Sequence, residues 1–270
     1  MELIKYVILG IIQGLTEPLP ISSSGHLLIF RELFNTNMFN DLNFEVMVNF
    51  GSFIAILIIF WKDIVRLVTS FFKYLFADKK DKKKYYEDFK YCMLIVVGSI
   101  PVGIIGLIFK DKIEAFASVK EVGFALLITA LALFIVKNSM GKKKDNEITY
   151  KDAIIIGLFQ MCALLPGLSR SGMVLVGCLL CGLNRESSLK YTFMLYFPVS
   201  VASFGLSSID VIQSGIASNL LLGYFLGTVA AGIVTYFTYQ WLSKIVQNGK
   251  LWKFSIYCVV VALFIFIYFR

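Results

Sequence analysis

The chain has 270 residues, of which 58% are hydrophobic and 16% are charged. A soluble domain carries about 25% charged residues, so this composition excludes an ordinary soluble fold. The formal net charge is +8, but the Lys and Arg residues gather in short connections between apolar stretches, which indicates contact with anionic lipid headgroups and argues against nucleic-acid binding.

Apolar stretches of helical length recur along the whole chain. They are residues 44–61, 91–109, 122–136, 152–165, 172–183, 191–209, 220–243 and 254–269. Several approach the roughly 20 residues that cross a bilayer, whereas an outer-membrane barrel would show short alternating segments. The sequence therefore predicts an all-α integral membrane protein. The first residues lack a cleavage pattern, so we expect Met1 to begin the mature chain.

Three basic connections, residues 62–90, 137–151 and 244–253, set the expected topology. The positive-inside rule places them in the cytoplasm. Six of the apolar stretches then cross the membrane, while residues 1–40 and 152–183 must enter and leave on one side, as two re-entrant helix pairs. We expect a single membrane domain, residues 1–270, made of two inverted repeats. The repeats cover about 1–136 and 150–270 and are joined by a basic cytoplasmic loop.

The two re-entrant regions are related in sequence at a constant offset of 147 residues. Arg170 stands where the first region has Ser23. A repeat whose halves enter from opposite faces is expected to place a site near the membrane midplane, between the halves. The matching pairs are Gln13 with Gln160, Ser22 with Ser169, Ser24 with Ser171, and Gly25 with Gly172.

The first region contains a predicted helix break beside polar side chains. Gln13 and Glu17 are four residues apart and share a helix face, and Pro18 disfavours helical conformation at Glu17. Ser22 is a good N-cap for a second helix, whose free N–H groups would favour an anion, and Gly25 would allow close backbone approach.

The second region repeats this arrangement and adds Arg170, whose guanidinium can bind phosphate oxygens in a bidentate way. Ionisable residues inside a membrane are functional candidates, and Glu17, His26 and Arg170 all qualify. A purely structural Glu17–Arg170 pair is the alternative. Such a pair would not require the clustered serines or His26, the only histidine of the chain.

These residue types suit phosphoryl transfer. Arg170, the serines and the helix N-termini would hold phosphate. Ser23 or His26 would attack phosphorus, or His26 would act as a general base. Glu17 with Gln13 could hold a divalent cation, and so few protein ligands suit Mg²⁺ or Ca²⁺ better than zinc.

The segments QGLTEPLPISSSGH (residues 13–26) and PGLSRSG (residues 166–172) closely resemble the two signature motifs of the undecaprenyl-diphosphate phosphatase family, which is linked to bacitracin resistance. The resemblance implies hydrolysis of a polyprenyl diphosphate lipid to the monophosphate, which recycles the lipid carrier of cell-wall synthesis. It also implies a re-entrant inverted-repeat fold, a divalent cation, and a site open to the outer face of the cytoplasmic membrane.

The resemblance also assigns roles. Glu17, Ser23, His26 and Arg170 match catalytic positions, and Gln13 with Glu17 matches a (Glu/Gln)-x-x-x-Glu motif that would hold the metal. Many members have Glu at the position of Gln13, so a cation here relies more heavily on Glu17. The expected substrate-binding residues are Gln13, Ser22, Ser24, Gly25, Ser169, Ser171 and Gly172.

Two other functions compete with this one. Inverted repeats also build transporters, so a carrier or flippase for a phosphate-bearing lipid is the alternative. The acid-phosphatase-like lipid phosphatases need a second histidine, which this chain lacks. The nucleophile, the identity of the metal, the preferred prenyl length and the oligomeric state, with a homodimer as one option, stay open.

Overall fold

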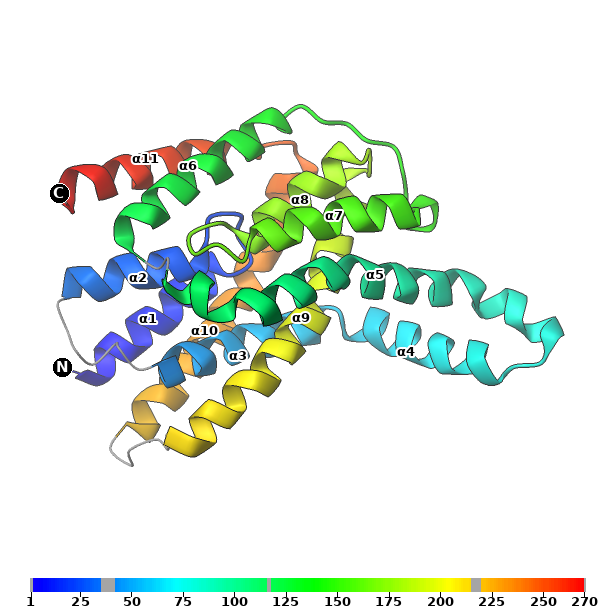
Figure 1. Ribbon diagram of the computed structural model, residues 1–270, viewed down its shortest axis with the longest axis horizontal. Coiled ribbons are helices and arrows are strands. Elements are labelled where there is room, and N and C mark those ends of the chain that lie inside the picture. The colour runs from blue at the N-terminus through cyan, green and yellow to red at the C-terminus, as the bar shows by residue number, and fades with distance from the viewer. Residues whose placement is uncertain (1, 35–41, 116–117, 215–219, 270) are drawn as a thin grey trace.

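The computed structural model describes residues 2–34, 42–115, 118–214 and 220–269, and these residues are mainly helical (Figure 1). The only β pairing among them is an isolated bridge between Lys143 and Leu183. This confirms the predicted all-α class. The helices are α1 (Glu2–Thr16), α2 (Ser23–Phe34), α3 (Leu42–Ile59), α4 (Trp61–Phe76), α5 (Lys79–Ala115), α6 (Val119–Ile135), the 3₁₀ turn η2 (Asp145–Glu147), α7 (Tyr150–Cys162), α8 (Arg170–Leu180), α9 (Arg185–Ser214), α10 (Leu221–Gln247) and α11 (Trp252–Tyr268).

Length and composition identify two or three membrane-crossing candidates among the described residues, fewer than the six predicted. Residues 80–109 of α5 and all of α10 are each long and apolar enough to cross alone. A third candidate is the pair of α3 and α4, which is bent by 75° at its break. Helices α6 and α11 have 17 residues each, the lower end of the spanning range. The expected outer connections near 110–121 and 210–219 lie partly outside the described residues.

One prediction about local structure is wrong. Residues 62–90 were expected to form a connection, but they form α4 and the first turns of α5, which make a projecting hairpin (Figure 1). Large apolar side chains recur at helical spacing along α4 and stay exposed, at Trp61, Val65, Val68 and Phe72. Basic residues indicate the side of the membrane, but Lys and Arg are also good helix formers. Charge counts alone therefore could not separate a loop from an amphipathic helix.

Two helix crossings depend on glycine. Helix α1 packs on α10, where a Cβ atom at Gly10 would lie 2.1 Å from the carbonyl oxygen of Gly227. Helix α7 packs on α5, where a Cβ atom at Gly157 would lie 2.5 Å from the carbonyl oxygen of Gly98. Both approaches exclude any larger residue, as is common where membrane helices touch.

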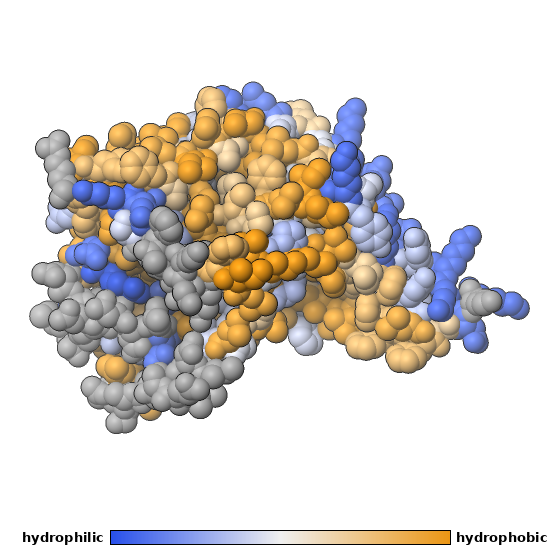
Figure 2. Space-filling model, viewed as in Figure 1, coloured by the Kyte–Doolittle hydropathy of each residue, from blue (hydrophilic) through white to orange (hydrophobic). Residues whose placement is uncertain are grey.

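The middle of the visible surface is apolar and its two ends carry polar residues. Figure 2 shows hydrophobic residues over the middle of this face, hydrophilic residues at the end formed by the α4–α5 hairpin, and further hydrophilic residues at the opposite end. Helices α10 and α11 expose large apolar side chains, among them Phe225, Phe237 and Ile267. Such extensive apolar exposure is expected where lipid, and not water, surrounds the helices.

Candidate functional site

The first of the two segments that were expected to be re-entrant, residues 1–40, has its helix break where the sequence predicted. Helix α1 ends at Thr16, before Pro18, and α2 begins at Ser23. The hydroxyl of Ser22 accepts a hydrogen bond from the backbone N–H of Gly25, 3.2 Å away, so the predicted N-cap is confirmed. Ser22 has a φ of 70°, which is unusual for a residue with a Cβ atom and forms the turn into α2.

The second of these segments, residues 152–183, is built in the same way. Helix α7 ends at Cys162 and α8 begins at Arg170, after a turn in which Gly167 has a φ of 90°. The hydroxyl of Ser169 accepts from the backbone N–H of Gly172 at 3.1 Å. The helix that follows each break, α2 or α8, therefore begins with a serine cap.

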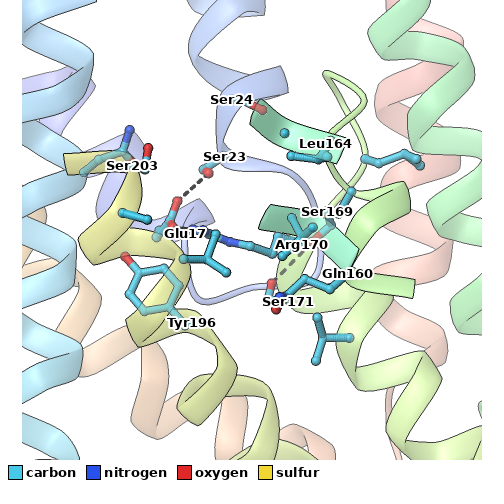
Figure 3. Close-up of a pocket in the computed structure, with 18 of the residues that line it drawn as sticks. Glu17, Ser23, Ser24, Gln160, Leu164, Ser169, Arg170, Ser171, Tyr196 and Ser203 are labelled. Carbon is cyan, nitrogen blue, oxygen red and sulfur yellow. Dashed lines mark hydrogen bonds and ion pairs between the residues drawn. The ribbon is translucent and has the colours of Figure 1, made fainter. Parts of the chain in front are cut away.

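The two turns meet inside the protein. The hydroxyl of Ser171 donates to the carbonyl oxygen of Leu19 at 3.0 Å, and a guanidinium nitrogen of Arg170 lies 3.1 Å from Oε1 of Glu17. Figure 3 shows Arg170 reaching between Glu17 and the serines of the second turn. Residues about 150 positions apart in the chain thus form one polar cluster.

This cluster lines a cavity of about 680 Å³, which we call the central cavity. Its apolar part is formed by α5 and α9, at residues such as Gly103, Leu107, Val199 and Leu206. It therefore offers a polar end and an apolar end to one ligand. The predicted site residues that line it are Glu17, Ser22, Ser23, Ser24, Ser169, Arg170 and Ser171.

Glu17 is the centre of the polar end, although only 7% of its side chain is exposed. Its Oε2 accepts from the hydroxyl of Ser23 at 2.5 Å (Figure 3). The same oxygen accepts from Nε2 of Gln13 at 2.9 Å. Its Oε1 pairs with Arg170. The carboxylate is therefore placed to take a proton from Ser23 and to hold the guanidinium in the cavity.

Arg170 is held on its other side by an aromatic ring. Its guanidinium carbon lies 4.6 Å from the ring centroid of Tyr196 on α9, a cation–π arrangement. About a third of the Arg170 side chain stays exposed. A guanidinium that is oriented by its neighbours and has unused donors is suited to a phosphate group.

Several predicted residues do not line the central cavity. His26 is buried, with Nδ1 at 2.7 Å from the carbonyl oxygen of Ser22 and Nε2 at 2.7 Å from the hydroxyl of Tyr257. Both ring nitrogens are thus engaged behind the turn, away from the position expected of an attacking group. Gln13 lies behind Glu17 and also donates to Asn49 at 2.6 Å.

Gly25 and Gly172, which match each other in the repeat, serve packing in this arrangement. A Cβ atom at Gly25 would lie 2.9 Å from Cγ1 of Val122, and one at Gly172 would lie 3.2 Å from Cβ of Pro20. Their N–H groups are already bonded to the capping serines. The structure therefore directs other donors, and not these two N–H groups, to a ligand.

The cavity also contains polar residues that the sequence reasoning did not select as site residues. Glu45 and Asn49 line it from α3, Gln160 from α7 and Tyr196 from α9. Glu45 and Asn49 interrupt an apolar stretch, which is the signal that had identified Glu17. Gln160 had been aligned with Gln13 but given no role, and nothing in the local sequence distinguishes Tyr196 from other aromatic residues.

The fit of a divalent cation depends on oxygen ligands. No group of three or more His, Cys, Asp or Glu side chains converges among the described residues. The carboxylates of Glu17 and Glu45 and the amide of Asn49 nevertheless line the same cavity. This donor set fits Mg²⁺ or Ca²⁺, which accept oxygen ligands and keep several waters, better than zinc.

Comparisons with known proteins find similarity over nearly the whole chain. A family model described as bacitracin resistance protein BacA matches residues 6–264. The chain is 41% identical to "Undecaprenyl-diphosphatase 2" of Bacillus thuringiensis over 267 residues, covering 98% of this chain and 97% of the relative. It is 41% identical to "Undecaprenyl-diphosphatase 1" of Bacillus licheniformis, covering 99% and 98%. It is 40% identical to "Undecaprenyl-diphosphatase" of Oceanobacillus iheyensis, covering 98% and 96%.

Proposed function

The chain belongs to the bacitracin resistance protein BacA family, and we propose that the central cavity is where it hydrolyses its substrate. The protein is an undecaprenyl-diphosphate phosphatase: it converts undecaprenyl diphosphate and water to undecaprenyl monophosphate and inorganic phosphate. The reaction recycles the lipid carrier and confers bacitracin resistance. The observation that carries the site is the contact of Ser23 and Arg170 with the same carboxylate, that of Glu17, inside the cavity.

Substrate binding begins with an exchange of partners at Arg170. In the free protein its guanidinium is paired with Glu17 and stacked on Tyr196. A diphosphate entering the polar end competes for this guanidinium, while the hydroxyls of Ser169 and Ser171 lie beside it. This exchange frees Oε1 of Glu17, while Oε2 keeps its hydrogen bond to Ser23.

Ser23 is the nucleophile in this proposal. Its hydroxyl lies in the cavity and donates to Glu17, so its proton passes to that carboxylate as the Oγ–phosphorus bond forms. The bond between the terminal phosphorus and the bridging oxygen breaks, and undecaprenyl monophosphate leaves. Water then attacks the phosphoserine, inorganic phosphate leaves, and Ser23 recovers its proton from Glu17.

His26 supports the turn and does not touch phosphorus. Its ring joins the carbonyl oxygen of Ser22 to Tyr257 of α11, and Ser22 is the residue with the left-handed backbone. This contact fixes the direction in which Ser23 leaves the turn. Gln13 supports Glu17 in a similar way.

A divalent cation, when bound, would supply charge neutralisation to the diphosphate. Glu17 would hold it, with Glu45 and Asn49 in the same wall, and Gln13 would orient Glu17 from behind. Glu45 is itself oriented by Arg31, 3.0 Å away.

Two inverted repeats account for the packing of α1 on α10 and of α7 on α5. Gly10 and Gly157 are related by the same offset of 147 residues as the two turns, and each makes the closest crossing of its helix. Helix α1 of the first half packs on α10 of the second, and α7 of the second half packs on α5 of the first. This reciprocal packing of one helix of each half on a helix of the other half supports the predicted inverted topology with six spans and two re-entrant pairs.

In this topology the central cavity faces away from the basic connections (residues 62–90, 137–151 and 244–253). Helices α5 and α9 begin near basic connections, and the cavity residues on them lie in their middle and later turns, from Ser99 to Leu107 and from Thr192 to Ser207. Because basic connections stay in the cytoplasm, the cavity opens towards the outer face of the cell membrane. The apolar end, beside Gly103 and Leu206, takes the prenyl chain.

The test is phosphate release from a polyprenyl diphosphate by the purified protein in detergent, with and without EDTA. The wild type should release phosphate and lose this activity in EDTA, while Glu17→Gln should be inactive under both conditions. Rapid acid quenching of the wild type should trap phosphate on Ser23, located by mass spectrometry. Absence of release with lipid binding intact would instead favour a carrier.

A further inference from the structure

Gln160 is a buried amide that none of the steps above uses. It lies in the last turn of α7 and is 1% exposed. Neither its Oε1 nor its Nε2 has a hydrogen-bond partner within the part of the chain that the structure describes. It lines the central cavity, beside Arg170 and Ser171 in Figure 3. Buried side-chain amides are nearly always bonded, so an amide with two unused atoms at a ligand cavity needs an explanation.

Comparison of the two halves of the repeat explains why Gln160 has no hydrogen-bond partner among the described residues. Its counterpart, Gln13, donates from Nε2 to Glu17 at 2.9 Å and to Asn49 at 2.6 Å. At the same offset of 147, Glu17 is replaced by Leu164 and Asn49 is replaced by Tyr196.

Neither replacement serves the Gln160 amide. A leucine side chain offers no acceptor, and the ring of Tyr196 is engaged beneath the guanidinium of Arg170. The amide nitrogen at this helix position thus donates two hydrogen bonds behind the first turn and none at the second. Gln160 lines the central cavity and Gln13 does not, so a ligand in the cavity would lie beside the unbonded amide of Gln160.

We propose that Gln160 binds the diphosphate, with its Nε2 donating to a non-bridging phosphate oxygen beside Arg170. This assignment rests on the proposed function, because it needs an anionic group in the central cavity. A neutral donor adds a directed hydrogen bond to the charge supplied by Arg170, and it orients the phosphate without forming an ion pair that would slow release. The unused Oε1 can accept from a hydroxyl of a protonated phosphate or from water.

The proposal makes two opposite predictions for Gln160→Met, which keeps the length of the side chain but removes the amide. Binding of a non-hydrolysable methylene-diphosphonate analogue of the lipid should weaken by roughly ten-fold or more, because a hydrogen bond to a charged group is lost. The thermal stability of the ligand-free protein should stay the same or rise, because an unsatisfied buried amide is replaced by an apolar group. A structural amide would behave in the opposite way.

Gln13→Met is the matched control, since it makes the same change at the related position. It should lower kcat through Glu17 and leave the Kd of the analogue near that of the wild type. Gln160→Glu should weaken analogue binding further than Gln160→Met, because a carboxylate repels phosphate.

The measurements are the Kd of the analogue, KM and kcat for the diphosphate, and the melting temperature in detergent. An unchanged Kd for Gln160→Met, or a fall in kcat alone, would overturn the proposal. A lower melting temperature for ligand-free Gln160→Met would also overturn it. The proposed function would fail separately, by an inactive wild type, and the analogue would still report on Gln160 in that case.

Discussion

The turn between α1 and α2 and the turn between α7 and α8 share a backbone plan but carry different chemistry. Each ends one helix, starts the next under a serine cap and packs against the other turn. The first turn holds Glu17 and Ser23, which are hydrogen-bonded and are the base and the nucleophile in the proposed mechanism. The second holds Arg170 where the first has Ser23, together with Gln160.

The difference shows how two related turns can divide the work of one site. In the proposed mechanism the first turn supplies the negative charge and the reacting hydroxyl, and the second supplies the cation and the donors that bind phosphate. Each turn can carry its charge inside the protein because the opposite turn neutralises it, as the Glu17–Arg170 pair shows. The following predictions test this division of roles, beginning with the largest expected effect.

The nucleophile of the first turn is tested by Ser23→Ala. We expect kcat to fall by roughly 10³-fold or more, because the attacking oxygen is removed. Ser24→Ala is the matched control, since Ser24 lines the same cavity without bonding to Glu17, and its kcat should fall far less. Steady-state phosphate release gives both values, and equal losses in the two variants would remove Ser23 from its role.

The cation of the second turn is tested by Arg170→Ala and Arg170→Lys. Arg170→Ala should lower kcat/KM by about 10²- to 10³-fold, because the charge that binds phosphate is lost. Arg170→Lys should recover only part of this, since an ammonium keeps the charge but loses the bidentate geometry and the stacking on Tyr196. If Arg170 served only to hold the halves together, its loss would lower the melting temperature and leave the Kd of the methylene-diphosphonate analogue unchanged.

The support of the first turn is tested by His26→Asn and Tyr257→Phe. The related position in the second half is Met173, so this contact belongs to the first turn alone. We expect His26→Asn to lower kcat by roughly 10- to 100-fold through misplacement of Ser23, well short of the effect of Ser23→Ala. Tyr257→Phe should act in the same direction but less strongly. Complete loss of turnover in His26→Asn, with phosphohistidine trapped in the wild type, would reverse the assignment.

The smallest effect is expected at the apolar end of the cavity, which the two turns share. A Cβ atom at Gly103 would meet nothing within 4 Å, so Gly103→Phe has room to project into the cavity without disturbing the helix contacts. It should raise KM by roughly five-fold for a long polyprenyl diphosphate and leave a short-chain substrate unaffected. An equal effect on both chain lengths would place the prenyl chain elsewhere.

Much of this protein could be predicted because a membrane simplifies the relation between sequence and structure. Apolar length located the helices, and Pro18 and the serine caps located the helix breaks, since both effects act within a few neighbouring residues. The polar residues Glu17, Ser23 and Arg170 were identifiable because ionisable and clustered polar groups are rare in apolar sequence. The helical structure of residues 62–90 was missed for the converse reason, because a polar and basic sequence is compatible with either a loop or a helix.

The tertiary structure alone decided which of these residues face the same space. Whether His26 points to the cavity or to Tyr257 depends on α11, more than 200 residues away, and the contact of Arg170 with Tyr196 depends on α9. The amide of Gln160 is likewise unbonded because neither α9 nor the second turn places a hydrogen-bond partner beside it. Local rules describe a helix and its ends. The direction of a side chain within a bundle is set by its neighbours from other helices, and those neighbours are known only once the helices have packed.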